Sequence, residues 1–287
     1  MRSILLGGMS LSVLLGIVTP CVASLPSCLP PVEIAAAKIS RVEQNGVLVL
    51  ADGRAVKIEG LLLPAGSKDH APQFLHQQAV AELDDLTRGR EVRLLARPAK
   101  EDRYGRIRAQ VIFPDDDSEP WLQAAMLRRG LARVSISPDR EECAKELYAA
   151  EAEARGKRAG IWASSSYAIR TPESIAPADL GTFQVVQGRV INSAVRGGRG
   201  YLNFGRDWRT DFSVTISPDD MKIFRAAVVD PQNYAGLTVR VRGWIDRMNG
   251  FEIEAAGPAS IEVVGKTSGL EESGHQTRPG KGPSLSN

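Results

Sequence analysis

Arginine and aromatic residues interleave between positions 196 and 209, and this combination of residue types can bind nucleic acid. The candidates for such a site are Arg196, Arg199, Tyr201, Phe204, Arg206 and Trp208, with Arg209 following directly. Aromatic rings stack on bases and guanidinium groups neutralise phosphates, so the pattern is typical of single-strand binding. Because a strand turns alternate side chains inward, a second interpretation stays open. In it, Tyr201 and Phe204 belong partly to the core and the arginines to a solvated loop.

Other residue types that often do chemistry lack the spacing that they need. His70 and His76 do not have the i, i+4 spacing of a helical metal pair. Ser164-Ser165-Ser166 has no histidine near it in the sequence and is typical of the start of a linker. Gly197-Gly198-Arg199-Gly200 is glycine-rich, but it predicts a hairpin loop rather than a nucleotide site. We therefore expect ordinary surface histidines and predict no metal ligands.

The charge balance limits what the whole molecule can attract. The chain has 287 residues with 36 Lys and Arg, 34 Asp and Glu, and a formal net charge of +2. Any nucleic-acid binding must then come from local patches rather than from a global field. The length and a hydrophobic content of 43% suit a globular protein of one large or two modest domains.

The N-terminus has the pattern of an export signal. Ser3 to Val18 is an uncharged, nearly continuous apolar run after a basic start, and Pro20 ends it. We predict a cleaved signal peptide over residues 1–23, because the run is short for a membrane span. A lipid anchor at Cys21 is the less favoured route, since proline precedes that cysteine. The mature protein is then periplasmic or secreted, with no stable membrane span.

Two cysteines remain after cleavage. Cys28 and Cys143 predict one disulfide, because exported chains form such bridges in oxidising compartments. The alternative is two unpaired thiols.

The hydrophobic pattern of the first half of the chain predicts a β-rich domain. Strand-like segments are predicted at 37–42, 46–50, 55–62, 91–96 and 106–113. Helices are predicted at 72–87, from near Pro120 to Gly130, and from Ser137 to about Lys157. Asp52-Gly53 marks a hairpin turn. Five strands mixed with three helices predict an α+β barrel, which we assign to residues 35–165.

A second domain follows a linker at residues 166–182. Its strand candidates are 183–192, 200–205, 212–216, 237–245, 251–255 and 261–264, with a helix at 217–229. This order over residues 183–265 resembles an OB-fold, a small barrel that often binds oligonucleotides or oligosaccharides. We expect a disordered tail at residues 266–287.

Three motifs give the first domain a resemblance to the staphylococcal nuclease (thermonuclease-like) family. They are Asp102-Arg103-Tyr104-Gly105-Arg106, residues 127–134 and residues 149–162. The resemblance covers roughly residues 37–163 and implies a five-stranded OB-type barrel with three helices. It also implies a calcium-dependent nuclease, with two aspartates for Ca²⁺, a glutamate base and two arginines on the phosphate.

The carboxylates of that catalytic set are missing. The two metal aspartates fall on Gly46 and Leu62, and the glutamate base falls on Ala65. Lys57 stands at one arginine position, where it keeps the charge but not the planar fork. Arg106 alone keeps its family identity. Since Ca²⁺ needs oxygen ligands, we predict no metal, no cofactor and a catalytically impaired domain that acts as a binding module.

Three functions stay open from the sequence. The first is a binding module whose partner is single-stranded nucleic acid or another polyanion. The second is a divergent metal-dependent phosphodiesterase with a relocated active site, built from Glu43, Asp52, Glu59 and Asp69. The third is a structural envelope protein without a nucleic-acid partner.

Overall fold

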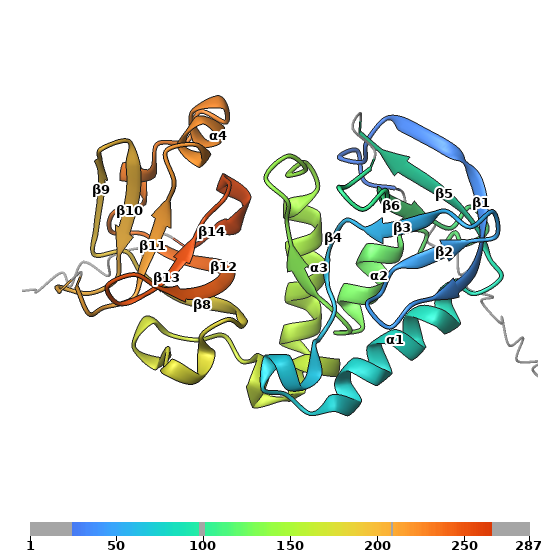
Figure 1. Ribbon diagram of the computed structural model, residues 1–287, viewed down its shortest axis with the longest axis horizontal. Helices are drawn as coiled ribbons and strands as arrows, with labels where there is room; N and C mark the ends of the chain where they lie inside the picture. Colours follow the sequence, from blue (N-terminus) through green and yellow to red (C-terminus); the bar gives the residue numbers. More distant parts are fainter. Residues whose placement is uncertain (1–24, 98–100, 208, 266–287) are drawn as a thin grey trace, which may run out of the picture.

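The computed structural model describes residues 25–97, 101–207 and 209–265 (Figure 1). The predicted signal peptide, the predicted disordered tail and Trp208 lie outside the described residues.

Five strands of the first domain close into a barrel, as the sequence predicted. They are β1 (Val32–Val42), β2 (Leu48–Leu50), β3 (Ala55–Ile58), β5 (Glu91–Ala96) and β6 (Ile107–Ile112). The pairing order is β1-β2-β3-β6-β5, and β3 runs parallel to β6. Alternate apolar side chains fill the interior, among them Leu48, Val56 and Val111, which are fully buried. The hairpin turn between β2 and β3 is the predicted Asp52-Gly53, where Gly53 has a φ of +88°.

The predicted strand at 55–62 divides into two parts. After β3 the chain passes Glu59 and enters β4 (Gly60–Leu62), which leaves the barrel and pairs with β7 (Arg133–Ser135). Gly60 makes this change of direction with a φ of +85°. A side chain there would need a left-handed backbone that L-residues other than glycine rarely adopt.

Three α-helices accompany the barrel, in the predicted order. They are α1 (Gln73–Thr87), α2 (Leu122–Arg128) and α3 (Ala144–Gly156). Helix α1 buries Leu75, Ala79 and Leu83, the stripe expected from helical spacing. Helix α3 begins later than predicted, because residues 137–143 form turns. Those turns carry the buried Arg140 toward Glu59 and end at Cys143, which bonds to Cys28.

The disulfide prediction is confirmed. Cys28 and Cys143 are bonded, with their Cα atoms 5.2 Å apart, a separation normal for a disulfide. The bridge fixes the start of the described chain to the beginning of α3. A disulfide indicates an oxidising environment. Within the described residues, no helix has the length and apolar character needed to cross a membrane.

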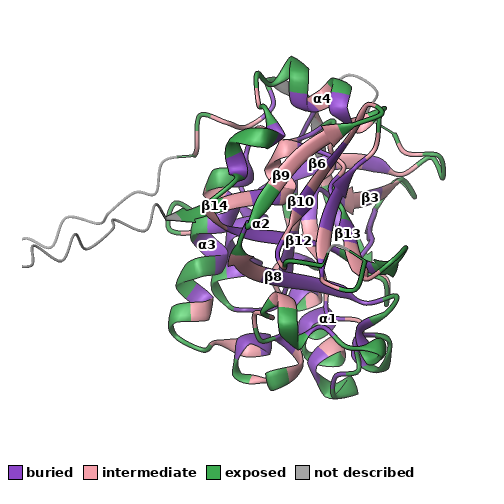
Figure 2. Ribbon diagram, turned by 90° about the vertical axis from the view of Figure 1, so that its left-hand side faces the viewer, coloured by how far each residue is buried: buried purple, intermediate pink, exposed green. Residues whose placement is uncertain are grey.

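The C-terminal part forms a sheet of seven strands. They are β8 (Phe183–Arg189), β9 (Asn192–Arg196), β10 (Arg199–Asn203), β11 (Ser213–Ile216), β12 (Thr238–Arg247), β13 (Phe251–Glu254) and β14 (Ile261–Gly265). Helix α4 (Asp220–Ala226) lies between β11 and β12 in the chain. Figure 2 shows β8 and β12 largely buried.

One long predicted strand, 183–192, is in fact two. β8 pairs with β12, whereas β9 pairs with β10. The change of partner occurs at Val190, which hydrogen-bonds Leu237, and at Ile191, which hydrogen-bonds Asn203. Residues 193–196 of β9 lie outside every predicted strand.

The pairing in this sheet repeats the order of the first barrel. β9, β10, β11, β13 and β12 are neighbours in that order, and β11 runs parallel to β13 as β3 does to β6. β8 and β9, consecutive in the chain, pair with different strands of this order, β8 with β12 and β9 with β10. That the domain is an OB-type barrel remains a prediction.

The C-terminal sheet contacts the barrel part of the chain through α3, which lies between the barrel and the sheet (Figure 1). Arg242 of β12 reaches Glu151 of α3, and Tyr148 of α3 donates a hydrogen bond to the carbonyl of Ala259. The predicted linker contains short 3-10 turns and bridges to β8 through Arg170. The second domain is therefore fixed to the first by side-chain contacts as well as by the chain.

Candidate functional site

The place of the first metal aspartate is closed by leucine. Gly46 has a φ of +81°, and a Cβ atom on it would lie 2.3 Å from Cδ1 of Leu63. Leu63 and its neighbour Leu61 pack against the barrel core. The region where the family resemblance implies a cation therefore holds apolar side chains, which offer no ligand to Ca²⁺.

Gly46→Ala is expected to lower the free energy of unfolding by more than Gly53→Ala does. Both glycines have positive φ, so alanine strains the backbone at either position. Gly53 has open space around its Cβ position, whereas Gly46 meets Leu63, so overpacking adds about 1–3 kcal/mol at Gly46. Urea unfolding of both variants measures the difference, and Leu63→Ala should rescue Gly46→Ala. Equal losses at the two glycines would show that Leu63 does not fill this space.

The segment that follows Leu62 is held by a structural network. Asp69 accepts hydrogen bonds from the backbone N–H of Ala65 at 2.8 Å, from Nη2 of Arg133 at 2.7 Å and from the hydroxyl of Tyr167 at 2.9 Å. Burial, together with the Asp69 carboxylate, raises the pKa of Tyr167. Ala65, at the position of the glutamate base, is therefore fixed by a carboxylate oxygen, Oδ2 of Asp69, that accepts three hydrogen bonds.

Arg106, the retained family arginine, is paired within its own turn. Its Nε lies 2.8 Å and its Nη2 2.6 Å from Oδ2 of Asp102, and its guanidinium lies 5.0 Å from the ring centre of Tyr104. Burial alone would raise the pKa of Asp102, but the hydrogen bonds from Arg106 and two backbone N–H groups lower it to about 2. Asp102 is thus ionised at neutral pH and holds Arg106 in place.

Lys57 lies beside a buried ion pair that the sequence analysis missed. Lys57 of β3 is the register partner of Arg108 of β6. Arg108 donates two hydrogen bonds, of 2.9 and 3.1 Å, to Glu59, which is only 3% exposed. The Lys57 ammonium lies 3.9 Å from the same carboxylate. The hydrogen bonds that Arg108 donates to Glu59, and to a lesser extent those to Asp139, raise the pKa of Arg108.

The four carboxylates considered for a relocated metal site do not gather. Glu59 forms an ion pair with Arg108, and Asp69 forms one with Arg133. Asp52 pairs with Arg54, and Glu43 lies 3.8 Å from Arg41. Among the described residues, no three His, Cys, Asp or Glu side chains converge where they could hold a metal ion.

His70 lies beside Ser165 and Ser166 in a pocket that no sequence motif predicted. A pocket of about 240 Å³ is lined by Asp69, His70, Ser165, Ser166, Arg170, Ala178 and Asp179. The hydroxyl of Ser166 donates to the backbone carbonyl of His70, not to its ring. Among the described residues, no hydrogen bond joins Ser165 or Ser166 to the His70 imidazole, the contact by which a Ser–His pair is recognised.

The predicted nucleic-acid-binding residues divide between core and surface. Phe204 is 6% exposed and packs on Phe212, so its assignment to a binding surface was wrong. The reason is strand alternation, which turns Leu202 and Phe204 inward and leaves Tyr201 facing outward. Arg196 and Arg206 are exposed, and Arg199 is half-buried.

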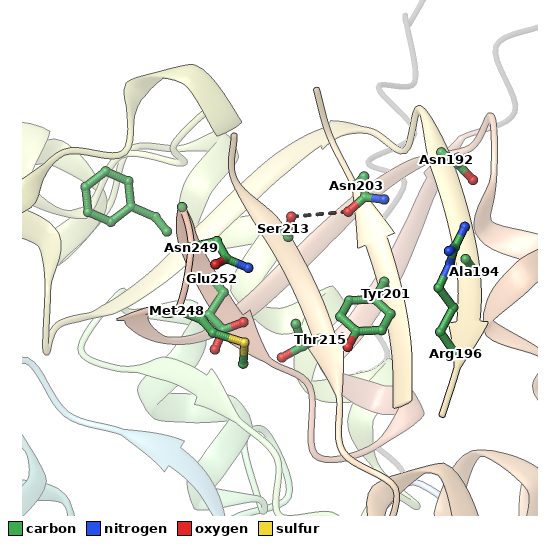
Figure 3. Close-up of a pocket in the computed structure, with 12 residues that line it drawn as sticks. Asn192, Ala194, Arg196, Tyr201, Asn203, Ser213, Thr215, Met248, Asn249 and Glu252 are labelled. Carbon is green, nitrogen blue, oxygen red and sulfur yellow. Dashed lines mark hydrogen bonds between the residues drawn. The ribbon is translucent and has the colours of Figure 1, made fainter. Parts of the chain in front are cut away.

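Tyr201 and Arg196 line a larger pocket on the C-terminal sheet. Its volume is about 370 Å³, and it is lined by Asn192, Ala194, Arg196, Tyr201, Asn203, Ser213, Thr215, Met248, Asn249, Gly250, Phe251 and Glu252. Figure 3 shows these side chains on neighbouring strands, with Asn203 bonded to Ser213. Sequence reasoning missed the polar members, although alternation along β9, β10 and β11 would have placed them on one face.

Comparison with known proteins identifies the first domain. Residues 63–164 match the family model described as Staphylococcal nuclease homologue. The match contains Ala65 and Arg106, and it begins directly after Leu62. A search of the curated proteins found no match. An SNase domain suggests a nuclease-like or nucleic-acid-binding function. From this match and the closed five-stranded barrel, we conclude that the N-terminal part of the chain is a staphylococcal-nuclease-like domain.

Proposed function

We propose that this chain is an exported, non-catalytic protein that binds single-stranded nucleic acid. The nuclease-like barrel is a scaffold, and the C-terminal domain, an OB-type barrel, presents the binding surface. The observation that carries the proposal is the closed calcium position. Leu63 fills the space beside Gly46, and neither Leu62 nor Ala65 has an oxygen in its side chain.

The remaining family groups support the same conclusion. Arg106 is paired with Asp102, and the Glu59 carboxylate near Lys57 is paired with Arg108. A cation site needs several oxygens converging on one point, and a water-activating base must be free to accept a proton. Neither condition is met by the groups around Arg106.

The family motifs have an architectural role in this proposal. Arg133, in the second motif, bonds the backbone carbonyl of Phe183 at the start of β8. Glu151, in the third motif, binds Arg242 of β12. Residues by which the nuclease-like domain is recognised thus position the binding domain.

Export is the setting that the disulfide favours. A bond between Cys28 and Cys143 persists in an oxidising compartment. We therefore place the mature protein in a periplasm or outside the cell, after cleavage of residues 1–23.

A nuclease assay with a binding assay tests the proposal. We expect the mature protein to leave single-stranded DNA intact in Ca²⁺, Mg²⁺ or Mn²⁺, because no three carboxylate, histidine or cysteine side chains of the described residues converge to hold a metal ion, and Ala65 stands at the position of the base. The same preparation should bind a labelled single-stranded oligonucleotide, with an affinity that falls steeply as salt rises.

Arg106→Ala serves as the control for cleavage. Metal-dependent cleavage that this substitution abolishes would establish the alternative, a divergent phosphodiesterase. Absence of oligonucleotide binding even at low salt would instead favour the structural envelope role.

A further inference from the structure

We propose that the larger pocket on the C-terminal sheet holds one base of a single-stranded nucleic acid, stacked on Tyr201, with a neighbouring phosphate on Arg196 and Arg199. This inference rests on the proposed function and adds to it the position and chemistry of the contact. The volume of the pocket, about 370 Å³, lies in the range of about 300–1,000 Å³ for small-molecule sites.

Four strands and one turn build the pocket. Arg199, Tyr201 and Asn203 alternate on the outer face of β10, while Gly200 and Leu202 face the core. Ser213 and Thr215 of β11 continue the wall. Met248 and Asn249 close one side from the β12–β13 turn (Figure 3). One aromatic ring beside several hydroxyl and amide groups suits a planar ring with polar edges.

Thr215 provides the first observation that points to a ligand in this pocket. Its side chain is 2% exposed and lines the pocket. Among the described residues, its Oγ1 has no hydrogen-bond partner. The Thr215 hydroxyl lies close enough to the Glu252 carboxyl group to lower its pKa, but the two groups are not oriented to form a hydrogen bond. Because a buried hydroxyl without a partner is unfavourable, a ligand that bonds Thr215 would remove a penalty that the free protein carries.

The arginines carry the second sign. Arg196 and Arg199 face each other directly across the β9–β10 hairpin, and like charges in that position destabilise a sheet. Arg199 lies 3.6 Å from Glu254, while Arg196 makes no ion pair within the part of the chain that is described. A phosphate between the two guanidinium groups would relieve this repulsion.

The arginine pair favours a nucleic acid over a neutral glycan. A glycan would satisfy the hydroxyl and amide groups, but it would leave Arg196 without a counter-ion and the two arginines opposed to each other. Glu252 is the acidic member of the pocket, and burial raises its pKa. That shift lessens the repulsion between its carboxyl group and a phosphate as the pH falls toward the acid range.

A neighbouring loop carries a further exposed arginine, together with Asp207 and Asp211, at the end of β10 opposite the Arg196–Arg199 pair. A Cβ on Gly250 would lie 2.4 Å from the carbonyl oxygen of Asp211 and 2.7 Å from that of Thr210. The pocket's turn therefore packs directly on the loop that carries Arg206, which is exposed. A strand of nucleic acid leaving the pocket would meet this arginine.

Abasic DNA separates a base pocket from simple charge attraction. The mature protein is titrated with labelled single strands of about twelve nucleotides, one with normal bases and one with abasic sites throughout. We expect the normal strand to bind about 5- to 100-fold more tightly, the range for stacking one base or slightly more. Tyr201→Leu should remove that difference, and Tyr201→Phe should keep it.

Matched arginine variants test the phosphate contact. Arg196→Ala should weaken both strands and reduce the slope of log affinity against log salt by about one. Arg225→Ala removes an exposed arginine of α4 outside the pocket and should change neither value. Thermal unfolding of each variant checks that it is folded.

Each other outcome overturns the inference in a distinguishable way. Equal, salt-sensitive binding of both strands removes the base pocket and leaves the proposed function standing. Binding of neither strand overturns both. If chitotetraose binds and Tyr201→Leu weakens it while neither DNA strand binds, the pocket takes a glycan.

Discussion

Replacing Glu151 with alanine is expected to lower the free energy of unfolding by about 3–5 kcal/mol, the range for removing one partner of a buried ion pair. Glu151 is fully buried, and the side chain of Arg242 is 2% exposed. Both Glu151 oxygens lie 3.0 Å from Nη1 of Arg242, and Arg155 bonds the same carboxylate. Glu151 also accepts the backbone N–H of Val134. Without it, two arginines face each other and a buried N–H loses its partner.

The neighbouring Glu153 is the matched control. It lies on the same helix, half-exposed, and pairs with Arg128 at 3.4 Å. Because exposed ion pairs add little to stability, Glu153→Ala should unfold at nearly the same urea concentration as the parent. Similar losses for the two variants would mean that helix propensity, not the buried network, determines the effect.

The double variant Glu151→Leu with Arg242→Met refines this test. Replacing both charges by apolar side chains avoids the uncompensated charge, so part of the lost stability should return. The Arg242 guanidinium lies 4.2 Å from the ring centre of Tyr148, and methionine can keep a contact with that ring. A double variant no more stable than Glu151→Ala would place the effect in packing instead of charge.

The sequence predicted the elements that depend on local pattern. The barrel strands alternate apolar residues, Asp52-Gly53 makes a tight turn, and α1 repeats leucine and alanine at helical spacing. These features depend on the nearest few residues. The predicted element boundaries that were wrong depend on contacts with residues distant in the sequence. β8 ends where the chain changes its partner from Leu237 at Val190 to Asn203 at Ile191. α3 starts late because residues 137–143 form turns, which bring Arg140 to Glu59 and Cys143 to Cys28.

The candidate site shows the same division. The loss of carboxylates at Gly46, Leu62 and Ala65 followed from a resemblance between motifs. The motifs could not predict that Leu63 fills the space beside Gly46, because the two residues are distant in the sequence and meet only in the folded barrel. Glu59 was considered as a metal ligand, yet the parallel pairing of β3 with β6 brings Arg108 to it. A carboxylate's partner cannot be known before strand order is.

Removing the disulfide is the second large effect that we expect. Cys28→Ala with Cys143→Ala should lower the free energy of unfolding by about 2–5 kcal/mol, because the bridge spans 115 residues and restricts the unfolded chain. Alanine is chosen because Cys143 is buried, and serine would place a hydroxyl in an apolar cluster. Urea unfolding with and without reductant measures the change.

The reduced parent protein supplies the control for this variant. Reductant should bring the parent to the stability of the double variant and leave the variant unchanged. If reductant does not alter the parent, the bridge does not stabilise the fold. The effect should extend to the second domain, because Glu141 lies two residues before Cys143 and accepts the backbone N–H of Ala259. Hydrogen exchange at Ala259 should therefore quicken in the double variant, since the turn that presents Glu141 loses its fixed end.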